Sequence, residues 1–81
     1  MSSEYEIISV ISSLSFISDE EIRLDDEFST IGIDSLKMVE LMIALEETFE
    51  ITFDDSELDL SLLKTVSDII NLTKKYLSKN G

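Results

Sequence analysis

The sequence contains no cysteine, no histidine, no proline and no tryptophan among its 81 residues. Without cysteine the chain can form neither disulfides nor thiolate metal sites, and without histidine it lacks the usual ligand sets for zinc, iron and copper. The same absences exclude Ser-His and Cys-His nucleophile pairs and the common general base near neutral pH. We therefore expect no catalytic residues, and only oxygen-ligated cations remain to be considered.

Positive charge is also scarce, because 18 acidic side chains stand against 6 basic ones and the formal net charge is −12. Residues 1–63 carry 17 acidic and 2 basic side chains, whereas residues 64–81 carry 1 acidic and 4 basic. Such a charge repels polyphosphates and attracts basic protein surfaces, so we expect protein partners and no nucleic acid. A hydrophobic content of 43% is too high for a disordered acidic chain and indicates a folded one.

No hydrophobic run is long enough for a membrane span. The longest uncharged apolar stretch, residues 7–17, is interrupted by four serines, and no positively charged segment precedes it. We expect a cytoplasmic protein without membrane insertion. A chain of this length buries only about 60% of its unfolded surface, which leaves one modest core. The expectation is a monomer with a single domain over residues 1–81, ordered from about 4 to 78.

The first half of the chain predicts one helix followed by a long loop. A helix begins at Ser3, where Glu6 completes a capping-box pattern, and continues at helical spacing to near Ser18. Residues 19–34 then form a long acidic loop, attached to the core by isolated apolar residues: Ile22, Leu24, Phe28 and Ile31. Gly32, the only internal glycine, marks the turn into the next helix.

The second half predicts two further helices and a short connecting segment. A helix spans residues 35–50, and Thr65 with Asp68 opens the last helix with a second capping-box pattern. The leucines of residues 54–63 alternate like a strand at first, but a lone strand has no partner, so a short helical turn is the better interpretation. The sequence therefore predicts an all-α fold: a small four-helix bundle with three main helices and one short helix.

The helix over residues 35–50 has two apolar faces when its side chains are placed at about 100° per residue. One stripe faces the core and consists of Met38, Leu41, Met42, Leu45 and Phe49. The opposite stripe consists of Leu36, Val39 and Ile43, with Glu40 and Glu47 among them. Ordinary core or scattered surface residues are the simpler interpretation of the second stripe. Its carboxylate border favours a docking surface for an apolar groove edged with Arg and Lys.

The residues at the start of this helix carry the most specific signal. Asp34 and Ser35 alone are explained as helix-capping residues. The longer string of residues 28–41, FSTIGIDSLKMVEL, resembles the phosphopantetheine attachment motif of acyl and peptidyl carrier proteins. The matching positions are Gly32, Asp34-Ser35-Leu36, Val39-Glu40-Leu41 and Leu45-Glu46-Glu47-Thr48-Phe49. The resemblance covers essentially the whole chain.

The resemblance implies a non-catalytic acyl carrier protein of the acyl-carrier helical type. Ser35 would be esterified by 4′-phosphopantetheine from coenzyme A, making a phosphoprotein whose arm carries acyl or aminoacyl groups as thioesters, with Asp34 and Leu36 beside it. The positions that match the family's partner-binding helix are Leu36, Val39, Glu40, Ile43 and Glu47. The implied partners are a phosphopantetheinyl transferase and the loading and condensing enzymes of fatty-acid, polyketide or nonribosomal-peptide biosynthesis, with basic docking surfaces.

Two departures from the fatty-acid carriers resemble carriers of polyketide or nonribosomal-peptide pathways and leave the choice open. Lys37 stands where fatty-acid carriers usually have an acid, and the loop from Phe28 to Ser35 is one residue shorter. Residues 54–63 are also slightly longer than the matching fatty-acid segment. The cargo itself is not written in the sequence. Met1 at the start of a short chain favours a discrete protein.

Three other functions compete with the carrier. An acidic helical interaction module could keep the same fold without the arm. A calcium site is suggested by the acidic runs at 25–27 and 54–57, but neither has the alternating ligands, central Gly and closing Glu of an EF-hand, so we expect no metal site. An enzyme using paired carboxylates such as Asp34 and Glu40 is opposed by the small size of the chain, which leaves little room for a cleft.

Overall fold

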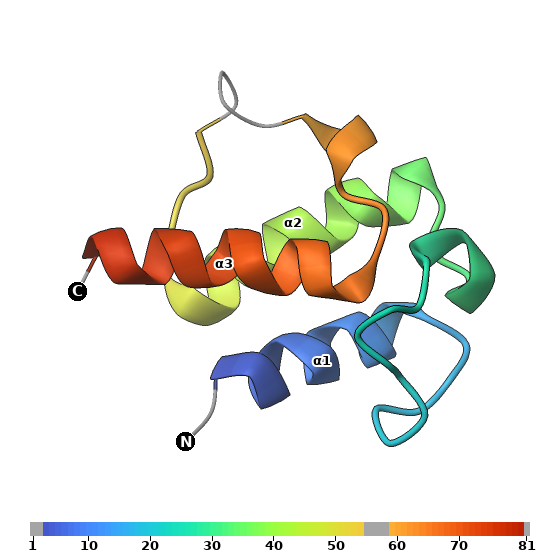
Figure 1. Cartoon of the computed structure of the whole chain (residues 1–81). Helices are drawn as coiled ribbons and strands as arrows, with labels where there is room; N and C mark the ends of the chain where they lie inside the picture. Colours follow the sequence, from blue (N-terminus) through green and yellow to red (C-terminus); the bar gives the residue numbers. More distant parts are fainter. Residues whose placement is uncertain (1–2, 55–58, 81) are drawn as a thin grey trace.

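Three α-helices and two short 3-10 helices make up the computed structural model, which describes residues 3–54 and 59–80. In chain order they are α1 (Ser3–Leu14), η1 (Phe28–Ile31), α2 (Ser35–Phe49), η2 (Leu60–Leu62) and α3 (Val66–Asn80) (Figure 1). Over this described part, extended pairing is limited to one isolated bridge between Glu27 and Thr65. The prediction of an all-α bundle with three main helices is confirmed.

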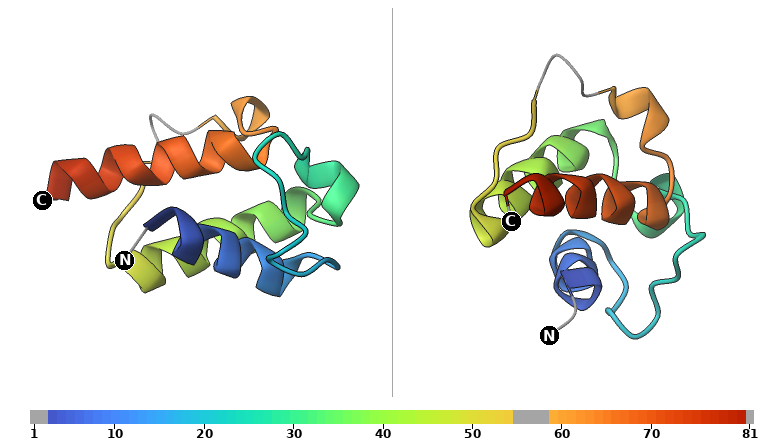
Figure 2. Two further views of the ribbon diagram at one scale, coloured as in Figure 1. Left: turned by 60° about the horizontal axis from the view of Figure 1, so that its bottom comes forward. Right: turned by 60° about the vertical axis from the view of Figure 1, so that its left-hand side comes forward.

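Helix α1 packs against both α2 and α3, as the two views of Figure 2 show. The helices meet through side chains that are fully buried, chiefly Ile7, Ile11, Leu41, Leu45, Val66 and Ile69. The segment between α1 and α2 adds further buried side chains, namely Ile22, Phe28, Ile31 and Ile33. Leu24, which we expected to attach this loop to the core, is instead 47% exposed. None of the described helices has the length and apolar content that a membrane span requires.

The end of α1 differs from the prediction, because the helix stops at Leu14 and not near Ser18. Two serine hydroxyls explain the early end. Ser12 Oγ and Ser15 Oγ donate hydrogen bonds to the carbonyl of Ile17 at 3.1 and 3.0 Å, and Ser15 Oγ accepts from Ile17 N at 3.2 Å. Serine side chains thereby satisfy backbone groups in a non-helical turn.

The short segments before α2 and α3 are 3-10 helices. Residues 28–31, which we expected to belong to the loop, form η1 in the structure. The short helix expected within residues 54–63 is present only as η2, Leu60–Leu62, and residues 55–58 lie outside the described part. Helix α2 ends at Phe49, close to the predicted end at residue 50.

The predicted capping box at the start of α3 is present. Asp68 Oδ2 accepts hydrogen bonds from Thr65 N and Lys64 N, both at 3.0 Å, and Thr65 Oγ1 accepts from Asp68 N at 3.4 Å. The bond from Thr65 N is the main reason that the pKa of Asp68 lies below its usual value, with a further contribution from Lys64 N. The ionised carboxylate of Asp68 therefore stabilises the start of α3.

We predict that Asp68→Asn lowers the free energy of unfolding at pH 7 by at most about 1 kcal/mol, since water screens this carboxylate. The pKa of Asp68 is lowered by folding, so its contribution is present above the usual Asp pKa and is lost as the pH falls through the folded-state value. Thermal unfolding from pH 7 to pH 3 should show the difference from wild type shrinking. The matched control is Asp25→Asn, an exposed aspartate; an equal loss there at pH 7 contradicts the prediction.

The core contains one polar side chain without a hydrogen-bond partner among the described residues, Thr73 of α3. Thr73 is fully buried, and its neighbours on the same helix face include Ile69, Ile70 and Tyr76. A buried hydroxyl without a partner destabilises the folded state by about 1 to 3 kcal/mol. The hydroxyl therefore makes no favourable contribution to stability.

We predict that Thr73→Val raises the free energy of unfolding by about 1 kcal/mol, because valine keeps the shape and removes the unpaired hydroxyl. Chemical denaturation measures the change. Thr73→Ser is the control, since it keeps the hydroxyl, removes a buried methyl group and should lower stability by about 1 kcal/mol. A valine variant less stable than wild type shows that the hydroxyl has a partner in solution.

Candidate functional site

The turn that leads into α2 depends on Gly32. Its φ of 86° lies in the left-handed region, and its N–H donates to the carbonyl of Phe28 to close η1. Ile33 N donates to the same carbonyl at 2.9 Å. The left-handed conformation disfavours any other residue at position 32, and a Cβ there would also displace the ring of Phe16. With Phe28, Ile31 and Ile33 buried, the backbone before α2 has a fixed position.

Asp34, and not Ser35, is the N-cap of α2. Asp34 has an extended backbone conformation, and its Oδ1 accepts a hydrogen bond from Lys37 N at 2.9 Å. Met38 N donates to the carbonyl of Asp34, also at 2.9 Å. Ser35 is therefore the first residue of the helix, and its side chain is exposed. Within the described structure the Ser35 hydroxyl makes no hydrogen bond, which leaves it available for chemistry.

Lys37, a departure from the family pattern, has a structural role at the same place. Its ammonium group donates a hydrogen bond to the carbonyl of Leu14, the last residue of α1, at 3.1 Å. A positive charge at the C-terminal end of a helix is favourable because the unpaired carbonyls there carry partial negative charge. The contact ties the first turn of α2 to the end of α1.

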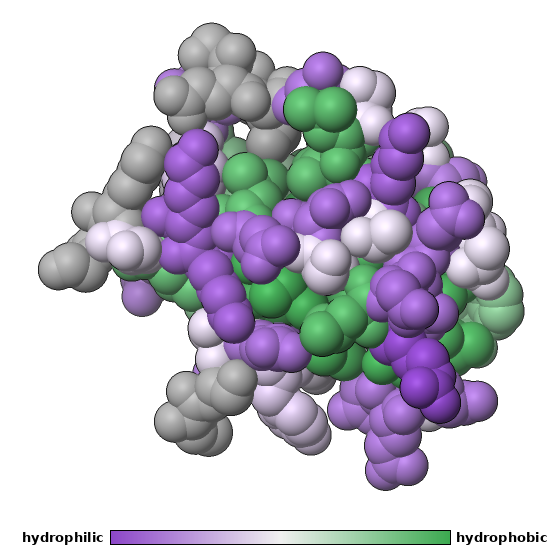
Figure 3. Space-filling model, in the orientation of Figure 1, coloured by the Kyte–Doolittle hydropathy of each residue, from purple (hydrophilic) through white to green (hydrophobic). Residues whose placement is uncertain are grey.

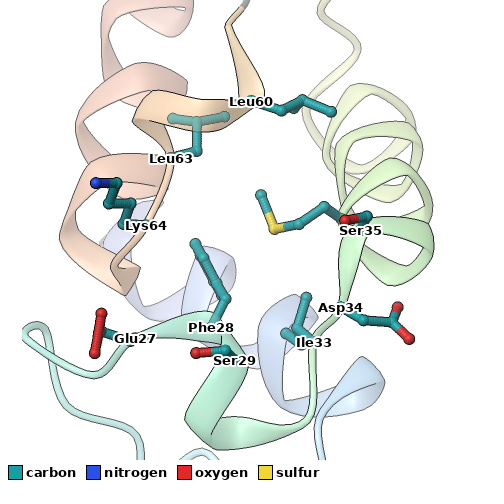
Figure 4. A pocket seen from close by; sticks show the side chains of 10 residues that line it. Glu27, Phe28, Ser29, Ile33, Asp34, Ser35, Leu60, Leu63 and Lys64 are labelled. Carbon is teal, nitrogen blue, oxygen red and sulfur yellow. The ribbon is translucent and has the colours of Figure 1, made fainter.

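A cavity of about 360 Å³ opens beside Ser35, between the first turn of α2 and the η2 segment (Figure 4). Its apolar lining comes from Phe28, Ile33, Met38, Leu60 and Leu63. The polar residues around it are Glu27, Ser29, Asp34, Ser35 and Lys64, with Glu27 and Lys64 on the side opposite Ser35 in Figure 4. This volume lies within the range of small-ligand pockets. Asp34 and Ser35 were expected from the sequence, whereas the opposite wall was not. Its residues are Glu27, directly before η1, and Leu60, Leu63 and Lys64, which lie in or directly after η2.

The η2 wall of this cavity is held by local bonds. Ser61 N donates to Asp59 Oδ1 at 3.0 Å, and Ser61 Oγ donates to the same oxygen. The hydroxyl bond is the largest of the causes that lower the pKa of Asp59. Leu60 and Leu62 remain 41% and 69% exposed, and Figure 3 shows hydrophobic side chains at the surface over this segment.

The two faces predicted for α2 are both observed. Met38, Leu41, Met42 and Leu45 are buried, and Phe49 is half-buried. On the other side Leu36 is 70% exposed, Val39 46% and Ile43 49%. Glu40 and Glu47 are exposed on the same side. Ser35 is thus the first residue of α2, and the five predicted partner-binding residues lie along the same helix.

Metal binding has no site in the described residues, because no three acidic side chains there come close enough to hold an ion. The acidic run at 25–27 lies in the described part, whereas most of the run at 54–57 lies outside it.

Comparison with known proteins agrees with the motif at the start of α2. The family model for the phosphopantetheine attachment site matches residues 6–73. An acyl carrier protein of Rickettsia bellii is 34% identical over 76 residues, which cover 93% of this chain and 86% of that protein. One from Chlamydia trachomatis is 34% identical over 94% of this chain and 97% of that protein, and one from Phaeodactylum tricornutum is 35% identical over 79% and 78%. The chain therefore belongs to the acyl carrier protein family, whose members are non-catalytic carriers with an attachment site for phosphopantetheine.

Proposed function

We propose that Ser35 is the residue that carries 4′-phosphopantetheine and that the chain delivers acyl or aminoacyl groups, held as thioesters on this arm, to partner enzymes. The observation that carries the proposal is the division of roles at the start of α2. Asp34 caps the helix through Lys37 N, so the exposed hydroxyl of Ser35 has no structural task.

The surroundings of Ser35 fit a phosphodiester. The first N–H groups of a helix have no partner within the helix and carry partial positive charge, which favours an anion at this position. Asp34 accepts from Lys37 N, and Met38 N pairs with the Asp34 carbonyl, so the N–H groups of Ser35 and Leu36 are left at the helix entrance. The negative charge of Asp34 opposes a phosphate to some degree.

The cavity beside Ser35 also suits an arm of mixed polarity. Apolar side chains such as Phe28 and Leu63 can shelter methyl groups, while Glu27 and Lys64 offer polar contacts at the opposite side. Bound phosphopantetheine supplies a thiol that forms thioesters. Because the chain has no cysteine, no protein thiol competes for the acyl group.

The exposed stripe of Leu36, Val39 and Ile43, with Glu40 and Glu47, is proposed as the partner-binding face of α2. The apolar side chains supply contact area, and the carboxylates speed and orient encounter with basic partners. The partners are a phosphopantetheinyl transferase and enzymes of fatty-acid, polyketide or nonribosomal-peptide biosynthesis. Lys37 has a structural role against Leu14, so it is a weak guide to the pathway. A cytoplasmic monomer with one carrier domain over residues 1–81 stays a prediction.

We predict that the purified chain gains the mass of one phosphopantetheine when incubated with coenzyme A, Mg²⁺ and a broad-specificity phosphopantetheinyl transferase. Intact-mass spectrometry measures the gain. Ser35→Ala should gain nothing while keeping its helical circular dichroism, because the Ser35 hydroxyl makes no structural bond in the described part.

Ser29→Ala is the matched control, since Ser29 is an exposed serine beside the same cavity and should leave loading unchanged. Loading of the Ser35→Ala variant refutes the site assignment. A folded wild type that two different transferases fail to load refutes the carrier proposal and favours an interaction module without the arm.

We predict that reversing Glu40 and Glu47 to Lys slows acyl transfer with a partner synthase by about three- to tenfold at low salt, because rim charges steer encounter. The difference should shrink as salt rises and screens the charges. Reversal of Glu20 and Asp25 is the control, since both are exposed and lie outside α2 and the change in net charge is the same. Equal rates for the two double variants at low salt remove the electrostatic part of the proposed face.

A further inference from the structure

Phe16 is the most exposed large hydrophobic side chain of the described structure, at 74%. It follows the end of α1 and lies outside the α2 stripe described above. Its backbone N–H donates to the carbonyl of Ile31 at 3.3 Å, and its ring lies over Gly32, which has no side chain to displace it. The aromatic ring is therefore supported by the turn before α2 while most of its surface faces water.

The turn that presents Phe16 is built from side-chain hydrogen bonds on both sides of it. Ser12 Oγ and Ser15 Oγ both donate to the carbonyl of Ile17, and Ser15 Oγ also accepts from Ile17 N. Because these bonds fix the backbone around residue 16, a partner that contacts the ring has less conformational entropy to remove.

Two contacts place this turn beside Ser35. Phe16 lies on Gly32, three residues before Ser35, and the carbonyl of Leu14 accepts from the Lys37 ammonium, two residues after it. Leu36, next to Ser35 in the chain, is itself 70% exposed. Two large exposed apolar side chains, Phe16 on Gly32 and Leu36 next to Ser35, thus lie close in the structure or the chain to the start of α2.

Charge restricts what can cover this ring. A second copy of the chain brings another net charge of −12, so like-charge repulsion opposes self-association. A partner with a net basic surface has the charge complementary to the whole chain, and buried aromatic anchors are typical hot spots of such contacts.

The position of Phe16 selects among basic partners. An enzyme that acts on the thioester reaches it through the length of the arm, whereas the transferase must bring coenzyme A to Ser35 itself. Transfer forms a bond between Ser35 Oγ and phosphorus, breaks the phosphoanhydride bond of coenzyme A, releases adenosine 3′,5′-bisphosphate and passes the serine proton to a base of the transferase. Contacts immediately around Ser35 are therefore most needed in that first step.

We propose that Phe16 inserts into an apolar pocket on the basic surface of the phosphopantetheinyl transferase that modifies this chain. The proposal rests on Ser35 as the modified residue. The transferase would then contact two parts of the chain: the partner-binding face of α2, and Phe16 in the turn that follows α1 and packs on Gly32.

The first test compares loading kinetics of wild type, Phe16→Ser and Tyr5→Ser with a phosphopantetheinyl transferase and coenzyme A. Tyr5 is the matched control, because it is 65% exposed and lies near the start of α1, away from the start of α2 (Figure 1). Phe16→Ser should raise KM for the carrier about tenfold with little change in kcat, as expected for the loss of an aromatic anchor. Tyr5→Ser should match wild type.

Equal KM values for Phe16→Ser and wild type overturn the proposal, as does a fall in kcat without a rise in KM, which indicates a misplaced Ser35. A wild type that is never loaded overturns the proposed function together with this contact. Light scattering of the carrier alone tests whether a second copy of the chain covers the ring. If the wild type is a dimer and Phe16→Ser is a monomer, the ring contacts a second copy and the proposal is overturned.

A second test needs no turnover. The chain has no tryptophan, so Phe16→Trp introduces a single indole reporter. The fluorescence of the transferase with unsubstituted carrier is measured first and subtracted. The remaining indole emission should shift to shorter wavelength when the transferase binds, because the ring leaves water. Tyr5→Trp should show no shift. Binding without a shift at residue 16 shows that the ring stays in water and overturns the proposal.

Discussion

The hydrogen bond from Lys37 N to the carboxylate of Asp34 determines what the start of α2 can do. Every helix leaves its first N–H groups without partners, and a short polar side chain at the N-cap usually satisfies one of them. Asp34 and Ser35 are both suited to that task, and only one of them can perform it. Since Asp34 performs it, the hydroxyl at the next position is exposed and free of structural bonds. The exposed, unbonded hydroxyl of Ser35 is thus a consequence of its neighbour's capping role.

Three separate contacts hold this helix start in place. Gly32 makes the left-handed turn that brings the chain to Asp34, Lys37 reaches the last carbonyl of α1, and Met38 enters the core from the opposite side of the helix. The start of α2 therefore combines an exposed serine hydroxyl with a backbone that has little freedom. This combination suits the proposed attachment of the arm at Ser35, because different enzymes would then meet the same geometry.

Features that depend on local patterns could be predicted from the sequence. Helical spacing identified the three main helices and both faces of α2, and the Thr65 and Asp68 pair identified the start of α3. The end of α1 could not be predicted from periodicity, because Ser12 and Ser15 compete for backbone groups that a longer helix would use. The cavity wall at Leu60 and Leu63 is brought to Ser35 only by tertiary packing. The contact of the Phe16 ring with Gly32 likewise depends on tertiary packing and not on a local pattern.

The contact between Phe16 and Gly32 also limits how this region can diverge. A side chain at position 32 would need both a left-handed backbone and space that the aromatic ring now fills. The two positions are therefore constrained as a pair, although they lie sixteen positions apart in the chain. A related sequence with alanine or asparagine at position 32 should have a small residue, or a shorter turn, at position 16. Covariation between these positions would identify the carriers that share this arrangement beside their modified serine.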